Sequence, residues 1–280
     1  MEPANKTNKL DELRSMLTRY NSAVIAFSGG VDSTLLARVA RDSINGNLLL
    51  VTATSSTYPF YELDDAKKIA AFLKIKHRII VSEEIEIPGF SNNPPDRCYY
   101  CKSELFAKIR YIAEQENYDV VFDGSNADDL NDFRPGIKAL KEKGILSPLV
   151  EAGLNKEEIR ELSRKFNLPT AEKPAYACLA SRFPYGEKIT RKKLDRVALA
   201  EKEIRNLGFK TFRVRSHENL ARLEFDRDEM DRAWGARNKL RSVCEKAGFL
   251  FITMDLKDFK SGSMNIVLKN QNSPYTRPKK

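Results

Sequence analysis

The sequence predicts an α/β protein in which a parallel sheet covered by helices is followed by a smaller α/β domain. Between residues 23 and 122, apolar strand-like runs alternate with helix-like segments. This alternation is typical of a parallel sheet with helices on both faces. From about residue 190 onward, helical and strand patterns alternate again. We therefore expect two α/β domains.

The expected elements follow from hydrophobic periodicity and from turn residues. Buried strands of the first domain are expected at 23–27, 48–53, 78–81 and 119–122, and helices at 31–43, 60–74 and 102–117. Asn155 is a candidate helix cap and predicts a helix over 155–167. In the second domain, helices are expected at 190–207 and 227–247, and strands at 211–216, 221–225, 249–254 and 264–268.

Length and composition indicate a globular protein of two domains. The 280 residues are enough for two cores, and the contents of 41% hydrophobic and 31% charged residues are ordinary for soluble proteins. We assign residues 1–180 to the first domain, 181–270 to the second and 271–280 to a disordered tail. Neither a signal peptide nor an apolar run of about 20 residues is visible, so we expect a cytoplasmic protein.

Positive charge is concentrated in the second domain. Residues 1–180 carry 24 basic and 26 acidic side chains, a net charge of −2, whereas residues 181–280 carry 24 and 13, a net charge of +11. A basic domain suits either a phosphorylated small molecule or nucleic acid.

The segment Ser28-Gly29-Gly30-Val31-Asp32-Ser33 joins an apolar strand to a helix. Glycines allow the backbone to approach an anion closely, and the amide groups that begin a helix attract it. The hydroxyl groups of Ser28 and Ser33 add donors, and Asp32 could hold Mg²⁺ on the phosphates. The segment therefore predicts a pyrophosphate-binding loop.

Two more loops are expected beside this one. Thr54 follows the second predicted strand, and Gly124 and Asn126 follow the fourth. The carboxyl ends of parallel strands meet at one edge of the sheet, where such folds bind ligands. The three loops together predict one nucleotide site, and Asp128 and Asp129 are further candidate Mg²⁺ ligands.

Four cysteines are present, and three of them suggest chemistry. Cys98 and Cys101 form a C-Y-Y-C pair, whose spacing suits a metal cluster, a redox pair or two inert thiols. Cys178 lies in a long loop rich in proline and small residues, beside Arg182, where a positive neighbour would favour the nucleophilic thiolate. Cys244 lies in a helical pattern and is expected to fill space.

The motif S-G-G-x-D-S resembles the PP-loop of the ATP pyrophosphatases, and the G-x-x-x-x-G-K-[ST] spacing of the common P-loop is absent. This resemblance implies the adenine nucleotide alpha hydrolase-like fold, which is Rossmann-like, and cleavage of ATP to AMP and pyrophosphate.

Four segments together resemble the LarE family of ATP-dependent sulfurtransferases, which act in nickel-pincer nucleotide synthesis. These segments are SGGVDS, DRCYYCK at 96–102, DGSNADDLNDFRPG at 123–136 and PAYACLASRFPYGEKIT at 174–190. The resemblance implies that a carboxylate of pyridinium-3,5-biscarboxylic acid mononucleotide is adenylated and then converted to a thiocarboxylate. It also implies a homo-oligomer, a trimer of dimers in that family.

Two sulfur sources are found in the family. In members with one cysteine at the position of Cys178, that residue gives up its own sulfur and becomes dehydroalanine. Members that also have a C-x-x-C are thought to hold a [4Fe-4S] cluster through three cysteines. Because Cys98 and Cys101 accompany Cys178 here, the resemblance favours the cluster.

The resemblance also assigns binding residues by position. Ser28, Gly29, Gly30, Asp32 and Ser33 would hold the ATP phosphates and Mg²⁺. Arg182, Arg213, Arg215 and Glu224 resemble the substrate-phosphate and interface residues of the family.

Two alternative functions share the PP-loop. A tRNA thiolase would use the basic second domain to contact phosphates, yet that domain has no recognisable RNA-reading motif. An ammonia-dependent synthetase, such as NAD or GMP synthetase, would leave Cys98, Cys101 and Cys178 without a role.

Overall fold

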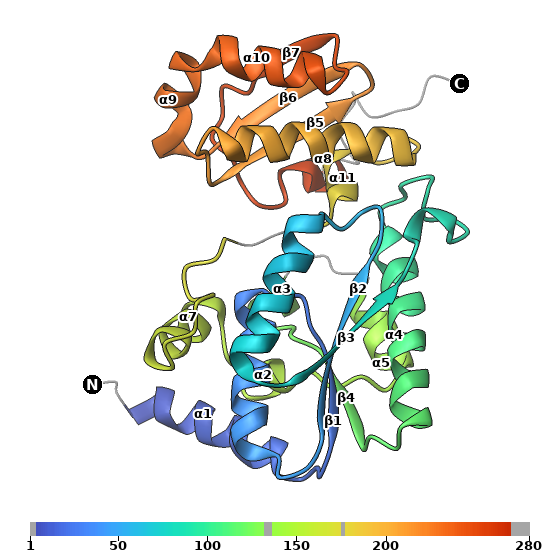
Figure 1. Ribbon diagram of the computed structural model, residues 1–280, viewed down its shortest axis with the longest axis vertical. Coiled ribbons are helices and arrows are strands. Elements are labelled where there is room, and N and C mark those ends of the chain that lie inside the picture. Colours follow the sequence, from blue (N-terminus) through green and yellow to red (C-terminus); the bar gives the residue numbers. More distant parts are fainter. Residues whose placement is uncertain (1–3, 132–135, 175–176, 270–280) are drawn as a thin grey trace. The chain divides into compact units, whose positions relative to one another are not determined.

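The computed structural model describes residues 4–131, 136–174 and 177–269, and the chain divides into two compact units (Figure 1). The first unit spans Met1–Phe90 and Asp96–Tyr176, and the second spans Ser91–Pro95 and Ala177–Lys280. The predicted tail, 271–280, lies outside the described residues.

The first unit contains a four-stranded sheet in the order β3-β2-β1-β4, in which every pairing is parallel. Its strands are β1 (Ala23–Ala26), β2 (Leu48–Thr54), β3 (Lys76–Val81) and β4 (Val120–Phe122). The predicted parallel α/β fold is thus confirmed. The chain moves outward from β1 to β3 and then returns to the other side of β1, so the strand order reverses between β1 and β4.

Helices cover both faces of this sheet. The helices are α1 (Ala4–Leu17), α2 (Val31–Ser43), α3 (Phe60–Leu73), α4 (Arg97–Gln115), α5 (Gly136–Glu142), α6 (Pro148–Glu151) and α7 (Lys156–Lys165), with 3₁₀ turns η1 (Glu84–Glu86) and η2 (Ala127–Asn131). Figure 1 shows α2 and α3 on one face and α4 and α5 on the other. Alternate residues of β1 point to opposite faces. Ile25 accordingly packs in the core that includes Leu35, and Val24 in the core that includes Phe106.

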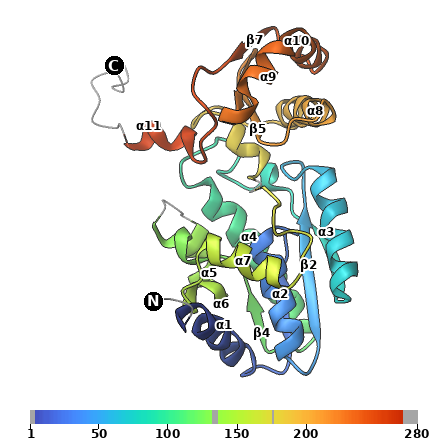
Figure 2. The same cartoon turned by 90° about the vertical axis from the view of Figure 1, so that its left-hand side faces the viewer.

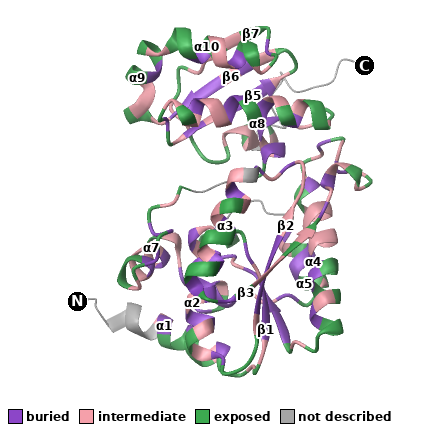
Figure 3. Ribbon diagram, viewed as in Figure 1, coloured by how far each residue is buried: buried purple, intermediate pink, exposed green. Residues whose placement is uncertain are grey.

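Two predicted elements of this unit differ from the structure. The apolar run 78–81 is expected to be a buried strand, but β3 is an edge strand of intermediate and exposed residues (Figure 3), and its Ile79 and Val81 are exposed. Among the described residues, β3 pairs with β2 along one edge and has no neighbouring strand along the other. The helix expected from residue 102 begins at Arg97, so that Cys98 and Cys101 lie in the first two turns of α4.

The second unit contains a three-stranded sheet in the order β5-β6-β7. Its strands are β5 (Phe212–His217), β6 (Leu220–Phe225) and β7 (Phe251–Met254), and its helices are η3 (Leu179–Arg182), α8 (Arg191–Asn206), η4 (Arg227–Glu229), α9 (Met230–Gly235), α10 (Arg237–Lys246), η5 (Ser263–Asn265) and α11 (Ile266–Lys269). β6 pairs antiparallel with β5 and parallel with β7. Its core includes Phe209, Phe212 and Phe225, whose rings are in contact.

The strand predicted at 264–268 is wrong, because this segment forms η5 and α11. Gly262 has a left-handed φ of 74°, and its carbonyl accepts a hydrogen bond from the Asn265 amide at 2.8 Å. Local hydrogen bonds therefore begin a helical turn. Ile266 and Val267 are exposed and belong to α11, so these apolar residues are not part of a sheet.

Across the described ranges, no helix combines the length and the apolar character that crossing a bilayer requires.

The burial of the four cysteines predicts their reactivity. Cys98 and Cys178 are exposed, whereas Cys244 has 0% exposure on α10 and burial raises the pKa of its thiol to about 12. We expect iodoacetamide to alkylate Cys98 and Cys178 of the metal-free native protein and to leave Cys244 unmodified, as measured by peptide mass spectrometry. Protein unfolded in guanidinium is the control, in which Cys244 reacts as well. Modification of native Cys244 at the rate of Cys98 would contradict the structure.

Candidate active site

The predicted pyrophosphate loop lies between β1 and α2, and its shape requires glycine. Gly29 has a φ of +67°, and a Cβ atom built there would lie 2.8 Å from the Cα of Ala66 on α3. No side chain fits between the loop and α3 without a shift of the backbone. The loop thus packs against α3, and no side chain at position 29 covers its amide groups.

Hydroxyl groups hold the same loop through long hydrogen bonds. The Gly30 amide donates to Ser28 Oγ at 3.3 Å, and Ser28 Oγ lies 3.2 Å from Ser33 Oγ. Gly30 is the N-cap of α2 and offers no side-chain acceptor to the first amides of this helix. An anion in the loop would accept hydrogen bonds from those amides and from both hydroxyl groups.

The loop after β4 packs directly on the start of α2. A Cβ atom at Gly124 would lie 3.1 Å from the backbone nitrogen of Ser33. This close approach brings Asn126 to Asp32, where the Asn126 side-chain amide donates to Asp32 Oδ1 at 3.4 Å. The structure therefore joins these two predicted loops, and the loop after β2 contacts the first of them through Tyr58. Thr54 ends β2, and its carbonyl accepts a hydrogen bond from the Ser82 amide at 3.0 Å.

The acidic groups at this edge already have partners. Asp32 Oδ2 pairs with the ammonium of Lys156, the first residue of α7, which lies beside α2 (Figure 2). The Lys156 backbone amide donates to Asp128 at 2.9 Å, and the Asn126 amide donates to Asp129 at 3.1 Å. Burial raises the pKa of Asp32 and Lys156 opposes this shift.

Sequence reasoning missed two residues of this site, Lys156 and Tyr58. Lys156 directly follows Asn155, the predicted helix cap. This cap is the sequence signal that could have located Lys156 at the start of α7. The Tyr58 hydroxyl donates to the Ser28 carbonyl at 3.1 Å. Burial raises the pKa of Tyr58, and Glu62 and Asp65 add to the effect, so this hydroxyl keeps its proton.

The C-Y-Y-C pair belongs to the first unit. Cys98 is exposed and Cys101 is partly buried. Cys101 Sγ donates to Glu84 Oε1 at 3.7 Å, and Thr57 Oγ1 donates to the other carboxylate oxygen of Glu84 at 3.1 Å. Burial raises the pKa of Glu84, which these hydrogen bonds oppose. The pair is thus linked to the loop that follows β2.

Cys178 belongs to the second unit and precedes a short helical turn. It is exposed, it is the N-cap of η3, and its Sγ accepts a hydrogen bond from the Ala180 amide at 3.4 Å. A sulfur at such a position receives backbone donors that stabilise a thiolate. The chain therefore presents a nucleophilic group to solvent on an ordered turn.

Buried ion pairs support the backbone of this turn. Arg182, with a side-chain exposure of 0%, binds both carboxylate oxygens of Glu201 at 2.8 and 3.0 Å. Its guanidinium also donates to the Ala177 carbonyl at 2.8 Å and to the Cys178 carbonyl at 3.4 Å. Burial is the largest influence on the pKa of Glu201 and raises it, but the charge and hydrogen bonds of Arg182, the charge of Arg213 and the Val214 amide together lower this pKa below its ordinary value.

A second buried pair acts on the same turn. Arg215 binds Glu224 at 2.7 Å and donates to the Ser181 carbonyl at 3.1 Å. Arg213, two residues earlier on β5, is partly buried, and its guanidinium lies over the ring of Phe259 at 4.6 Å. We call Cys178 and η3 together the thiol turn. Of the predicted substrate residues, Arg182, Arg215 and Glu224 thus belong to the buried ion pairs that support this turn.

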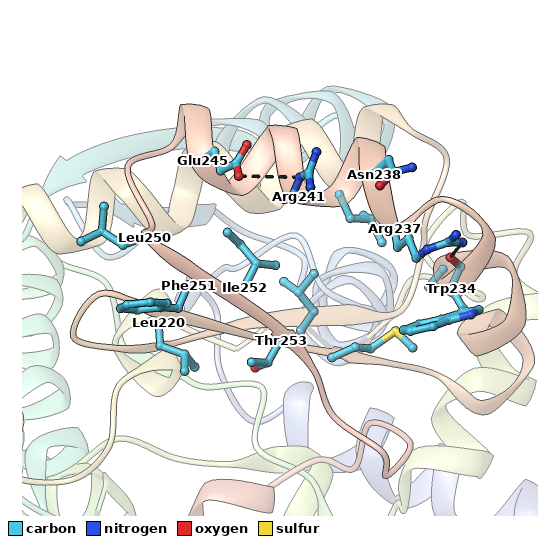
Figure 4. Close-up of a pocket in the computed structure, with 14 residues that line it drawn as sticks. Leu220, Trp234, Arg237, Asn238, Arg241, Glu245, Leu250, Phe251, Ile252 and Thr253 are labelled. Carbon is cyan, nitrogen blue, oxygen red and sulfur yellow. Dashed lines mark hydrogen bonds and ion pairs between the residues drawn. The ribbon is translucent and has the colours of Figure 1, made fainter.

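No group of three or more His, Cys, Asp and Glu side chains gathers as a metal site among the described residues. Cys98 and Cys101 belong to one unit and Cys178 to the other. A pocket of the second unit lies between α10 and β7 and is mainly apolar, with an Arg241–Glu245 ion pair of 3.7 Å at its edge (Figure 4). Its lining contains no cysteine.

Comparison with known proteins relates these features to a family. The asparagine synthase family model matches residues 17–131. The chain is 43% identical to uncharacterized protein slr1717 of Synechocystis sp. over 93% of this chain and 98% of that protein. It is 34% identical to the pyridinium-3,5-bisthiocarboxylic acid mononucleotide synthase of Lactiplantibacillus plantarum, over 95% of this chain and 96% of the synthase. It is 30% identical to uncharacterized protein MJ0830 of Methanocaldococcus jannaschii, over 90% and 98%.

The contact of Gly29 with α3 predicts that alanine is not tolerated there. We expect G29A to lower the free energy of unfolding of the first unit by about 2–4 kcal/mol and to abolish ATP binding, because a Cβ atom meets the Ala66 backbone. Urea unfolding and ATP titration measure the two effects. G186A is the matched control, since Gly186 has a φ of +82° with nothing within 4 Å of a Cβ atom. Equal losses in both variants would show that backbone strain alone accounts for the effect.

The buried Arg182–Glu201 pair predicts a large effect of E201Q. Because one charge is left buried without its partner, we expect the second unit to lose about 3–5 kcal/mol, measured by urea unfolding at pH 7. The pKa of Glu201 is below its ordinary value of 4.5, so the contribution of the pair is complete at neutral pH and is lost as the pH falls below 4.5. The difference between wild type and E201Q therefore shrinks in acid.

The control for E201Q is E203Q, which makes the same change on the same helix at a side chain that accepts only a long hydrogen bond, 3.5 Å, from Asn206. A loss in E201Q no larger than in E203Q would mean that the pair does not hold the turn.

Proposed function

Because this chain belongs to the LarE family, whose member in Lactiplantibacillus plantarum is a pyridinium-3,5-bisthiocarboxylic acid mononucleotide synthase, we propose that it makes the same product. It is an enzyme of the PP-loop ATP pyrophosphatase family. Its substrate is pyridinium-3,5-biscarboxylic acid mononucleotide, and its reaction is ATP-dependent sulfur transfer in nickel-pincer nucleotide synthesis. The exposed thiol of Cys178, fixed on an ordered turn, is the observation that carries the proposal.

The first step is activation of a substrate carboxylate. The Ser28–Ser33 loop and the first amides of α2 bind the ATP phosphates, with Gly124, Asn126 and Thr54 around the nucleotide. A carboxylate oxygen attacks the α-phosphorus, the bond to the β-phosphate oxygen breaks, and pyrophosphate leaves. The uncovered amides and hydroxyl groups stabilise the negative charge that gathers on the leaving group.

Mg²⁺ fits the oxygen donors of this site, since it is usually held by one or two carboxylates and the phosphates of the substrate. Asp32, at the start of α2, would be its principal protein ligand. Asp128 and Asp129, in η2 after β4, are the further candidate ligands. Bound Mg²⁺ would neutralise phosphate charge.

The second step moves sulfur to the activated carbon. The Cys178 thiolate attacks the acyl-adenylate, a carbon–sulfur bond forms, and AMP leaves with the electron pair of its bond to carbon. Removal of the Cα proton of Cys178 then breaks the bond between Cβ and sulfur. Where no cluster is bound, the products are the thiocarboxylate and dehydroalanine, and the protein has supplied the sulfur atom.

The C-Y-Y-C pair supports a second sulfur source. Cys98, Cys101 and Cys178 form no disulfide within the described ranges, and a [4Fe-4S] cluster needs only three thiolate ligands when one iron stays open. We propose these residues as the cluster ligands. The bound cluster would supply sulfide and would spare the sulfur of Cys178.

Binding of the mononucleotide phosphate is assigned to the basic second unit. Arg213 is the proposed phosphate contact, because it is only partly buried. Arg182, Arg215 and Glu224 then act as positioning residues for the thiol turn. Homo-oligomer formation and a cytoplasmic location complete the proposal. The free thiols and the use of ATP support that location.

The proposal predicts a specific product. Anaerobic protein, both with reconstituted iron and sulfide and without, is incubated with ATP, Mg²⁺ and pyridinium-3,5-biscarboxylic acid mononucleotide, and small molecules and protein are then analysed by mass spectrometry. We expect AMP, pyrophosphate and a thiocarboxylated product. Intact Cys178 after turnover identifies cluster-borne sulfide, and dehydroalanine there identifies a sacrificed thiol. Without AMP or thiocarboxylate, the proposed substrate is wrong.

Single cysteine changes separate the steps. C178A is expected to form AMP while transferring no sulfur, because activation precedes attack by the thiolate. C98A and C101A are expected to lose bound iron, measured by its absorbance and by metal analysis. C244A, a change at the buried cysteine of α10, is the control and keeps both properties.

A further inference from the structure

Lys156 has a place in the nucleotide site that the proposed reaction leaves unexplained. Its ammonium pairs with Asp32 Oδ2, and its own backbone amide binds Asp128. The other oxygen of Asp32 accepts the Asn126 amide. Both oxygens of the carboxylate that is offered to Mg²⁺ thus already have a donor.

The backbone of Lys156 is fixed, so that only its side chain can move. Asn155 and Glu158 form a capping box at the start of α7, and Glu158 also binds the ammonium of Lys9 on α1 at 2.8 Å. Ile159 of α7 is fully buried in the core. The Lys156 side chain itself is partly exposed and therefore has solvent into which it can swing.

An ammonium and a divalent cation on one carboxylate repel each other, and this repulsion is strong where solvent is partly excluded. Burial disfavours an unpaired Asp32 carboxylate, and Lys156 compensates for it. The Lys156 ammonium therefore offsets the charge of Asp32 in the absence of metal, and an arriving divalent cation disfavours its place there.

We propose that Lys156 is the resident cation of Asp32 in the nucleotide-free protein, and that its ammonium leaves Asp32 when a divalent cation enters with ATP. The inference rests on the proposed function in one respect, namely that Asp32 is the carboxylate that binds Mg²⁺. Lys156 is thus a positioning residue. It keeps the loop charge-balanced while the site is empty, and it disfavours binding of a divalent cation that comes without nucleotide.

The first test measures binding of Mn²⁺ alone to nucleotide-free protein, by electron paramagnetic resonance of the free ion. K156M keeps the length of the side chain without its charge, and we expect it to bind Mn²⁺ about tenfold more tightly than the wild type does. K156R keeps the charge and should resemble the wild type. The double change K156M with D32N should remove the added affinity, because Asp32 provides it.

K9M is the matched control, since Lys9 also ties α7 to a neighbour but has its partners at Glu158 and the Gly153 carbonyl. It should leave Mn²⁺ affinity at the wild-type level. The proposal is overturned if K156M binds Mn²⁺ within about twofold of wild type, or if its gain survives D32N.

A second test uses the wild-type chain and so does not depend on folding of a variant. The Lys156 ammonium signal of ¹⁵N-lysine protein, assigned by its loss in K156R, should shift when Mg²⁺ and a non-hydrolysable ATP analogue are added together, and not when AMP is added alone. An unchanged signal with Mg²⁺ and the analogue would also overturn the proposal. Neither test uses the pyridinium substrate or a cluster, so a failure of the proposed sulfur transfer leaves both readouts intact.

Discussion

The parallel pairing of β1 with β2 on one side and β4 on the other is the constraint on which the nucleotide site depends. This pairing brings the loop after β4 so close to the start of α2 that a Cβ atom at position 124 would lie only 3.1 Å from the Ser33 nitrogen. The same approach joins Asn126 to Asp32, and α7 then adds Lys156. An anion-binding helix terminus, hydroxyl donors and one carboxylate meet there because the sheet order reverses at β1.

Burial of charge organises the second unit in a different way. The carbonyl groups of Ala177, Cys178 and Ser181 point into the protein and need donors there. Arg182 and Arg215 provide these donors, and Glu201 and Glu224 balance their charge. An apolar layer of the same volume would leave the Ala177 and Ser181 carbonyl groups without these donors, whereas the Cys178 carbonyl also accepts a hydrogen bond from the Ser181 amide at 2.9 Å. The ion pairs therefore serve the shape of the thiol turn, which fits their cost in desolvation.

The division of chemistry between the units matches the division of charge. The nearly neutral first part of the chain contains the nucleotide loops and the C-Y-Y-C pair, whereas the basic last part contains Cys178 and the arginines of β5. In the proposed reaction, the nucleotide loops of the first unit would activate the carboxylate, whereas sulfur transfer would use Cys178 of the second unit and, where a cluster is bound, the C-Y-Y-C pair of the first. Similarity to the synthase over nearly the full chain agrees with a function that needs both.

The sequence by itself determined the parallel α/β fold, the bounds of α2, the cap of α7 and the place of the pyrophosphate loop. These are local features, because periodicity, a capping residue or a strand–glycine–helix junction encodes each of them within a few positions. Tertiary structure alone decided that Arg182 and Arg215 are buried and that Lys156 pairs with Asp32. The last two residues are 124 positions apart, and no local pattern records such a contact. The apolar run at 266–269 shows the same limit of periodicity, because such a run becomes a strand only where a neighbouring strand is available to pair with it, and here local hydrogen bonds after Gly262 begin a helical turn instead.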